Sequence, residues 1–403
     1  MRFFAFIKLF NMIFSKKKLP DLDWIQKQGL LFIKIAQTFA LRIDFLSPEA
    51  TIHLQKLFNK ANPKKVTSES LISILPKKLN NVIKNINKEP IGVASVGQVH
   101  KAELIDGRVV AVKFIKTDVE DSFKREVKSF RRFIKFITFF YPKLHKVADP
   151  LGVLEHIEEY TIAELDLRNE IKHSKILQNI KKKYENKFDF STLNFPEYDE
   201  NLSTKNVLVS SFIEGTSVDA CLREKKLSED KMLDIFRWHG FYMFIVGTFH
   251  GDIHPGNIIY NNGKFTLIDT GAISTVSKRI QQGLFEFMKA LSQYDYVECA
   301  LKLNQMAVVS ISGEKYKKFE KKILELYSDF TDTTVTEKSL TKQMMYTIRL
   351  GVLSGMTFEK GMFPIIKSLM YLDGVVLQGA PDMILMKEMR KYIKSFEEAK
   401  ENV

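Results

Sequence analysis

Cysteine is scarce in this sequence, whose 403 residues include only Cys221 and Cys299. Two isolated cysteines cannot form a disulfide framework or a cysteine-based zinc site, so the composition indicates a reducing, cytoplasmic compartment. Long apolar runs are also missing. The nearest, residues 241–249, has about half of the roughly 20 residues that a membrane-spanning helix needs, and it predicts a buried helix instead. No nucleic-acid-binding module is recognisable, so nucleic acid is not an expected partner.

Acidic residues are outnumbered by basic ones. The 61 Lys and Arg against 48 Asp and Glu give a formal net charge of +13. A basic surface attracts anionic lipid and phosphorylated ligands, and we expect lipid or nucleotide phosphates as partners. With 45% hydrophobic and 27% charged residues, the composition is that of a globular protein with one large or two smaller cores.

The N-terminal 18 residues are rich in Phe and Ile and end in Lys16–Lys18. Lys8 interrupts the apolar part and no small-residue cleavage site follows, so we do not interpret the segment as a signal peptide. As a helix it would carry Lys8, Asn11 and Ser15 on one stripe. Such a helix can lie in a membrane interface or pack on the body of the protein, and the sequence leaves both open.

A second stretch, residues 128–143, combines Phe, Lys and Arg. Its apolar residues at helical spacing are Phe130, Phe133, Ile134, Ile137 and Tyr141. This face predicts core packing or, as the alternative, attachment to an anionic membrane surface.

Hydrophobic periodicity predicts an α+β protein with a β-rich small lobe followed by a helical large lobe. Helices are expected in 20–60, with starts at Pro20-Asp21 and at Ser47-Pro48-Glu49, short helices and linkers in 61–87, helices again in 119–190 and mostly helices from 227 onward. Strands are expected in 95–104 and 109–115 around Asp106-Gly107, in 206–212, and in the hairpin 257–260 and 264–268. We therefore expect four segments along the chain. They are a basic N-terminal segment (1–19), a helical extension (20–87), the small lobe (88–214) and the large lobe (215–403).

The strongest motif is His250-Gly251-Asp252-Ile253-His254-Pro255-Gly256-Asn257, followed by Leu267-Ile268-Asp269-Thr270-Gly271. Phosphoryl transfer needs a carboxylate near the attacking hydroxyl and oxygen ligands that hold metal on the phosphates. Asp252 is the predicted catalytic carboxylate. Asn257, five positions on, and Asp269, one hairpin later, are the predicted ligands of Mg²⁺ or Mn²⁺. This register is typical of a kinase catalytic loop.

A phosphate-binding half is predicted upstream. Lys113 ends the run Val110-Ala111-Val112-Lys113 and is predicted to contact the phosphates of ATP. The small-residue loop before it is expected to lie against the nucleotide, although it is not a G-x-G-x-x-G motif. Its residues are Ile91, Gly92, Val93, Ala94, Ser95, Val96, Gly97, Gln98 and Val99. Glu170 is the candidate partner of Lys113. Read as one helix, the segment 164–170 would place Asp166 and Glu170 on one face.

Together these pieces resemble the UbiB family of atypical kinases, also called ADCK-type or aarF-domain kinases. Lys34-Ile35-Ala36-Gln37 is similar to the family's K-x-G-Q signature, and Glu164-Leu165-Asp166 to its E-x-D motif. Residues 207–215 resemble its hinge strand, with Ser211 and Ile213 at the nucleotide, and residues 369–381 its last helices. The long gap between Lys113 and Glu170 fits the family's extra helices.

The sequence departs from the family pattern at four places. Ala36 replaces the K-x-G-Q glycine, Gly92 and Val93 stand where alanines are usual, Thr270 replaces the Phe of D-F-G, and Ser211 stands at an acidic hinge position. The first is a small change, the loop changes affect how the loop meets the nucleotide, and Thr270 alters packing beside the metal while leaving Asp269 in place.

The resemblance implies a bilobal protein-kinase-like fold with a helical N-terminal extension packed over the active-site cleft. Lys34 on that extension would meet the Glu164/Asp166 pair across the cleft, and Gln37 belongs to the same regulatory signature, which makes phosphorylation of free proteins unexpected. The implied activity is that of an ATP- and Mg-dependent atypical kinase or ATPase in isoprenoid quinone biosynthesis or lipid handling. Isoprenoid lipid and quinone-biosynthesis proteins are the implied partners, with attachment to the inner face of a membrane. The motifs identify neither a phosphoryl acceptor nor an oligomeric state.

Two alternatives stand beside this interpretation. Aminoglycoside and choline phosphotransferases carry H-G-D-x-H-x-x-N, but they lack the Lys34–Gln37 helix, the Ala/Ser loop and the Glu164-Leu165-Asp166 motif. A scaffold that binds nucleotide without turnover is the other. The presence of Lys113, Glu170, Asp252, Asn257 and Asp269 argues against a dead site. An acceptor screen tests the first alternative and an ATP-hydrolysis assay the second.

Overall fold

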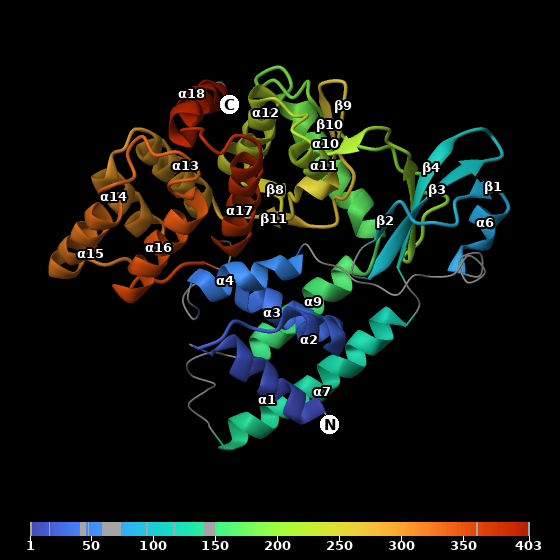
Figure 1. Cartoon of the computed structure of the whole chain (residues 1–403), viewed down its shortest axis with the longest axis horizontal. Coiled ribbons are helices and arrows are strands. Elements are labelled where there is room, and N and C mark those ends of the chain that lie inside the picture. Colours follow the sequence, from blue (N-terminus) through green and yellow to red (C-terminus); the bar gives the residue numbers. More distant parts are fainter. Residues whose placement is uncertain are drawn as a thin grey trace. The chain divides into compact units, whose positions relative to one another are not determined.

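The computed structural model describes residues 2–15, 17–40, 46, 48–58, 74–93, 96–115, 118–140, 150–359 and 362–401. The chain forms two compact units, the first comprising Met1–Lys172 and Pro196–Phe212 and the second His173–Phe195 and Ile213–Val403 (Figure 1). The chain therefore passes into the second unit between Phe212 and Ile213, close to the boundary expected at 214/215. The boundaries expected at 19/20 and 87/88 lie within the first unit and stay predictions.

The sheet of the first unit is antiparallel and has the strand order β1-β3-β4-β6, with β2 paired to β3. Its strands are β1 (Ile83–Ile86), β2 (Gly92–Val93), β3 (Gly97–Leu104), β4 (Val109–Ile115) and β6 (Val207–Ser211). The hairpin predicted around Asp106-Gly107 is confirmed, and Gly107 adopts a φ of 87° that favours glycine. The expectation of only short helices and linkers in 61–87 is wrong, because β1 forms the sheet edge there.

The two faces of this sheet have different surroundings because side chains alternate along a strand. Val110, Val112 and Phe114 of β4 are buried in a core that includes Leu79 of the short helix α6 (Lys77–Asn80). Lys113, between Val112 and Phe114, therefore points to the opposite face. At Gly97 of β3 an added Cβ would lie 2.2 Å from the Phe114 carbonyl oxygen, so the two strands require glycine there.

The remaining elements of the first unit are helical. They are α1 (Arg2–Ile13), α2 (Leu22–Gln28), α3 (Leu30–Ala40), α4 (Pro48–Gln55), the 3₁₀ turn η1 (Lys56–Phe58), α7 (Val119–Phe140), α9 (Pro150–Glu164) and the first residues of α10 (Arg168–Tyr184). The two predicted helix starts are confirmed. Asp21 caps α2 by accepting a hydrogen bond from the Trp24 N–H at 3.0 Å, and α4 begins at Pro48.

The helices α1, α3 and α7 share one apolar core. Phe6 of α1 stacks on Phe32 of α3 with the ring centroids 4.8 Å apart, and Phe130 and Phe133 of α7 contact the same Phe6 ring. Ile134 is buried in the same cluster. Core packing is thus confirmed for this face of the 128–143 stretch, while Tyr141 and Lys143 lie outside the described residues.

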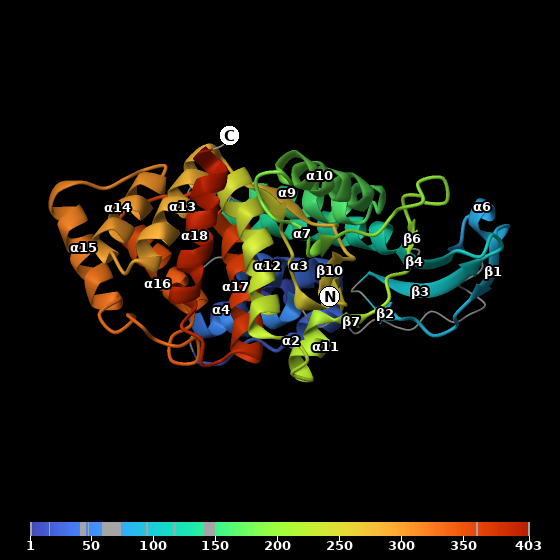
Figure 2. The same cartoon turned by 90° about the horizontal axis from the view of Figure 1, so that it is seen from above.

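The second unit contains mostly helices, with two small sheets (Figure 2). Its strands are β5 (Leu193–Asn194), β7 (Thr216–Ser217), β8 (Thr248–His250), β9 (Ile258–Asn261), β10 (Lys264–Leu267) and β11 (Ile273–Thr275). Its helices, besides the rest of α10, are α11 (Val218–Arg223), α12 (Glu229–Gly240), the π-helix η2 (Phe241–Val246), the 3₁₀ turn η3 (Pro255–Asn257), α13 (Lys278–Ser292), α14 (Tyr296–Met306), α15 (Gly313–Leu326), α16 (Leu340–Leu353), α17 (Met362–Gly379) and α18 (Leu385–Glu401). The sheets are ordered β5-β10-β9-β7 and β11-β8.

The apolar run 241–249 corrects one expectation. Its helix ends at Val246, and Gly247 turns the chain with a φ of 75° into strand β8. β8 pairs with β11, and this pairing delivers the His250 loop to the end of a sheet. Among the residues with described structure, none of the helices combines the length and apolar character that crossing a bilayer requires.

Candidate active site

His250 joins the two predicted catalytic segments in the second unit. Its buried Nδ1 accepts a hydrogen bond from the Asp252 N–H at 3.0 Å. The ring proton must then sit on Nε2, which donates to the Asp269 carbonyl oxygen at 2.5 Å. Burial lowers the pKa of the His250 imidazole and so favours this neutral form. One ring thereby fixes the backbone at Asp252 and at Asp269.

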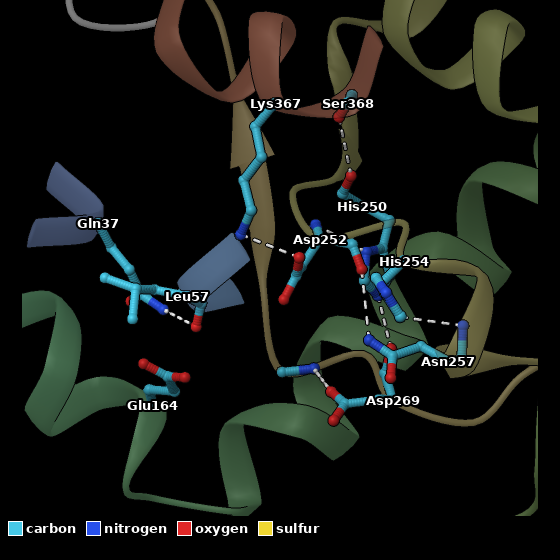
Figure 3. A network of polar contacts seen from close by, with 12 residues as sticks. Gln37, Leu57, Glu164, His250, Asp252, His254, Asn257, Asp269, Lys367 and Ser368 are labelled. Carbon is cyan, nitrogen blue, oxygen red and sulfur yellow. Dashed lines mark hydrogen bonds and ion pairs between the residues drawn. The ribbon is translucent and has the colours of Figure 1, made fainter. Parts of the chain in front are cut away.

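The loop between Asp252 and Asn257 is a tight turn held by its own hydrogen bonds. The His254 N–H donates to the Asp252 carbonyl at 2.7 Å, and the Asn257 side-chain amide donates to the same oxygen at 3.4 Å. The His254 ring caps η3 by accepting from the Gly256 N–H. Asn257 therefore reaches back over the loop that carries Asp252, as drawn in Figure 3.

The β9–β10 hairpin brings Asn257 and Asp269 together as the sequence predicts. Leu267 pairs with Ile258, and the Ile268 N–H donates to the Asn257 carbonyl at 3.0 Å. One Asp269 carboxylate oxygen accepts from the Gly271 N–H at 2.9 Å, which orients the carboxyl group. Amide and carboxylate oxygens suit a hard divalent cation, so this pair fits Mg²⁺ or Mn²⁺. Within the described residues, no group of three or more His, Cys, Asp or Glu side chains is placed to hold a metal.

Asp252 has a partner that the sequence interpretation missed. Lys367 of α17 places its Nζ 2.9 Å from a carboxylate oxygen of Asp252 (Figure 3). Burial raises the pKa of the Asp252 carboxyl, but the Lys367 ammonium outweighs it, and the pKa lies below its ordinary value. The one sequence signal was a lysine inside the apolar run Ile365-Ile366-Lys367-Ser368-Leu369.

Lys113 and Glu170 meet in the first unit. Nζ of Lys113 lies 2.7 Å from Oε2 of Glu170, whose side chain is 2% exposed. The expected i,i+4 relation of Asp166 and Glu170 is wrong, since α9 ends at Glu164 and α10 begins at Arg168. Asp166 lies in the turn between them, where it accepts from the backbone N–H of Arg168 and pairs with its guanidinium. Glu170 therefore contacts Lys113 from the first turn of α10, after the helix break.

The predicted nucleotide loop is partly described. Ile91 donates to Val99, and Gly92 and Val93 pair with Val99 and Gln98. Val99 pairs with Lys113 across β3 and β4, so the two share a face of the sheet. Gln98 lies on the other face, fully buried against the His100 ring. Its side chain therefore does not accompany Lys113. Val96 is partly buried against the apolar cluster that includes Ile115 and Leu165, and Ala94 and Ser95 lie outside the described residues.

The hinge positions lie on either side of the passage between the units. Ser211 ends β6, where its N–H donates to the Glu197 carbonyl at 2.8 Å and its Oγ accepts from the Glu197 N–H at 3.0 Å. Ile213 is the first residue of the second unit. The nucleotide contacts proposed for both remain predictions.

The K-x-G-Q-like helix is tied to the helices that follow the sheet. Lys34 of α3 pairs with Glu164, the last residue of α9, as the sequence led us to expect for Glu164 or Asp166. Gln37 donates to the Leu57 carbonyl at 3.1 Å. At the start of α3, the buried Glu126 of α7 accepts from the Leu31 N–H at 3.1 Å. The extension is thus held by hydrogen bonds as well as by its apolar core.

The comparisons with known proteins agree with this geometry. A profile of the ABC1 atypical kinase-like domain matches residues 55–303, more than half of the chain. The chain belongs to the ABC1 atypical kinase-like family.

Curated relatives of this ABC1-family chain include kinases by name. It is 26% identical over 386 residues to an "uncharacterized protein in hydrogenase 1 5′ region" of Clostridium pasteurianum, covering 92% of this chain and 69% of that one. It is 26% identical over 287 residues to the "probable protein kinase UbiB" of Aliivibrio fischeri, covering 68% and 52%. Against the chloroplastic "activity of bc1 complex kinase 8" of Arabidopsis thaliana the identity is 27%, with 72% and 38% covered. The chain thus spans about half or less of the last two relatives.

A solved structure supports the fold. The complex of Rv3197 with erythromycin from Mycobacterium tuberculosis superimposes with a TM-score of 0.51 at 19% identity, covering 89% of this chain and 90% of that one. The predicted resemblance to the UbiB/ADCK group and the α+β, kinase-like fold class are confirmed. The family match includes Lys113, Glu170, Asp252, Asn257 and Asp269, whereas Lys34, Gln37 and Lys367 lie outside it.

The two lysine–carboxylate pairs of the first unit should differ in their effect on stability. Glu170 is 2% exposed but Glu164 is 34% exposed, so water screens the second pair more. We expect Lys113→Met to lower the free energy of unfolding by roughly 3–5 kcal/mol and Lys34→Met by about 1 kcal/mol. Denaturant unfolding followed by circular dichroism measures both. Equal losses of unfolding free energy would show that solvent exposure does not determine how much each pair contributes to stability.

Proposed function

We propose that this ABC1-family protein is an ATP-dependent atypical kinase or ATPase that uses Mg²⁺ or Mn²⁺. The observation that carries the proposal is the His250 junction, which fixes Asp252 and Asp269 through one neutral ring, with Asn257 beside them. Asp252 acts as the carboxylate at the attacking oxygen. Asn257 and Asp269 hold the metal, and Lys113, oriented by Glu170, binds the phosphates.

Each group has a separate task in this proposal. The Asp252 carboxylate accepts a proton from an attacking water or hydroxyl as the new O–P bond forms and the bond to ADP breaks. Asn257 and Asp269 supply oxygen ligands, and the bound cation neutralises phosphate charge. Lys113 meets phosphates that are charged already in the ground state. Binding and turnover should therefore depend on different residues.

The experiments described below also distinguish two other functions. A nucleotide-binding scaffold would bind ATP with the same residues and show no turnover. A small-molecule phosphotransferase would turn over rapidly only with an added acceptor. Membership of the ABC1 family favours the atypical kinase over the second of these.

Three variants should lose different properties. Asp252→Asn keeps the shape of the side chain and removes its negative charge. Stabilisation by ATP should therefore persist, while the rate of ATP hydrolysis falls about 10²- to 10⁴-fold. Asp269→Asn should abolish the additional thermal shift that Mg²⁺ gives to ATP. Lys113→Ala should weaken nucleotide binding itself. Thermal melts with ATP, with and without Mg²⁺, and a phosphate-release assay measure all three.

The exposed ion pair Lys317–Glu314 on α15 offers a control for these variants, because Lys317→Ala removes a lysine with no role in the site. It should match the parent in every assay. Parent-rate hydrolysis by Asp252→Asn would make the catalytic-loop assignment wrong. Undiminished binding with no turnover in the parent, with or without an acceptor, would favour the scaffold.

The proposed biological role is support of isoprenoid quinone biosynthesis or of lipid handling. It rests on the likeness to the UbiB group that the motifs and relatives share. Cells lacking the gene should show a lowered quinone pool or an accumulated precursor in lipid extracts analysed by mass spectrometry. The parent gene should restore the profile and the Asp252→Asn gene should not. A profile unchanged by deletion would contradict this role.

We also propose peripheral attachment to an anionic membrane through the two segments expected from the sequence, but by a different face of residues 128–143. Four exposed rings form an aromatic patch, namely Phe4 of α1 and Phe136, Phe139 and Phe140 of α7, with exposed fractions of 77%, 52%, 78% and 60%. The ring of Phe3 links them, with its centroid 6.2 Å from Phe4 and 5.3 Å from Phe136. Contiguous exposed apolar surface marks an interaction site.

The charges around the aromatic patch favour a membrane as its occupant. Arg132 and Lys135 are exposed on α7 next to Phe136. Exposed aromatic rings beside cations suit the boundary between headgroups and acyl chains of an anionic bilayer. A hollow of about 450 Å³, lined by Phe4, Ile7, Lys8 and Lys18 among others, runs along the outer side of α1. It extends the same mixed apolar and basic surface.

Replacing the α7 rings should weaken membrane binding. Phe136→Ser/Phe139→Ser/Phe140→Ser should lower flotation with anionic liposomes at least about tenfold, because each buried ring contributes roughly 1.5–3 kcal/mol. The matched control is Val308→Ser/Val309→Ser/Leu353→Ser in the second unit, where the side chains are 50%, 53% and 72% exposed. The control should float like the parent. Equal flotation with neutral and anionic liposomes, or none with either, would count against the surface.

A further inference from the structure

Lys367 occupies a position that ordinary packing would give to an apolar residue. It lies in α17 between Ile366 and Leu369, both buried, and is itself 8% exposed. Lysine is almost never this buried unless it is paired. Its ammonium lies 2.9 Å from the Asp252 carboxylate and 5.8 Å from the centre of the Tyr371 ring. The side chain crosses apolar surroundings to place one charge at the catalytic loop.

The pair is poorly explained as a stabilising contact. Burial of the Lys367 side chain, which is 10% exposed, costs desolvation energy, and water screens the attraction because the Asp252 side chain is 34% exposed, so the pair adds little net stability. The neighbouring Ser368 contacts the same loop, with its Oγ donating to the His250 carbonyl at 3.5 Å. Two adjacent residues of α17 thus engage both ends of His250–Asp252. Both residues therefore direct their polar atoms at the catalytic loop.

The loop has no cation of its own. Between His250 and Asn257 the sequence contains neither lysine nor arginine. The titratable groups that face Asp252 are His250 on β8, Asp269 after β10, His254 on the loop and Lys367 on α17. Burial keeps both histidines towards their neutral forms, and Asp269 repels a second negative charge. Among the described residues that act on Asp252, Lys367 is therefore the cationic partner that can orient its carboxylate.

We propose that Lys367 is a positioning residue of the catalytic loop, whose ammonium, 2.9 Å from the Asp252 carboxylate, holds that carboxylate oriented towards the attacking oxygen. The inference rests on the function proposed for Asp252. In the step it supports, the carboxylate takes the proton of the attacking hydroxyl or water, the oxygen bonds to the γ-phosphorus, and the bond to ADP breaks. The proton later leaves to solvent.

The test compares Lys367→Met with Lys367→Arg. Lys367→Met keeps most of the length of the side chain and removes its positive charge, so kcat for ATP hydrolysis should fall about 10- to 100-fold with little change in KM. A loss in kcat without a change in KM is the result that a merely structural role of Lys367 would not give. Lys367→Arg should keep most of the rate because it keeps the positive charge. The control Lys391→Met, in an exposed pair with Glu388 on α18, should match the parent.

A second measurement needs no turnover. Thermal unfolding of the parent, Lys367→Met, Asp252→Asn and the double variant forms a cycle in which a coupled pair gives non-additive shifts. If the parent hydrolyses ATP and Lys367→Met has the parent kcat, the inference is overturned and the proposed function stands. If the parent shows no hydrolysis, the proposed function fails, and additive unfolding shifts would then overturn the pairing as well.

Discussion

The candidate site depends on one neutral imidazole. His250 accepts from the Asp252 N–H and donates to the Asp269 carbonyl, so a single ring sets the spacing between the catalytic loop and the metal loop. Both bonds can exist together only when the ring carries one proton, since a protonated ring has no acceptor. Burial supplies this condition by disfavouring the charged form. The fold around β8 and β11 matters to the chemistry because it keeps water from this ring.

The lysine–carboxylate pairs of the two units differ in how far they are enclosed. Glu170, Glu164 and Asp252 each have a lysine partner, but the Glu170 side chain is 2% exposed whereas those of Glu164 and Asp252 are each 34% exposed. Such pairs give little net stability, because desolvation offsets the attraction in the enclosed pair and water screens it in the others. Their repeated use is better explained by orientation, because a carboxylate held by an ammonium presents its charge in one direction. Stability comes instead from apolar packing such as that of Phe6, Phe32 and Phe130.

Local patterns predicted most of this arrangement. The Asp252-to-Asn257 spacing and the hairpin to Asp269 lie within one short stretch, so the turn and the strand register almost determine their geometry. β1 was missed because an edge strand with exposed Lys84 and Asn85 has little apolar signal. The helix expected to carry Asp166 and Glu170 is broken at Leu165–Leu167, where two buried leucines anchor a turn that periodicity cannot distinguish from helix. Pairing with β3 decided the first case, and burial of the two leucines decided the second.

Lys367 shows what motif reading cannot supply. Helices α13 to α16 separate it from Asp252 along the chain, and it lies beyond residues 55–303, which the family profile covers. A loop that lacks its own cation must obtain one from whichever element packs behind it, and here that element is α17. The loop residues therefore set the position of the Asp252 carboxylate, whereas Lys367 of α17 restricts its orientation. Changes in the packing of α17 can then tune the chemistry while every residue of the His250–Asn257 motif stays the same.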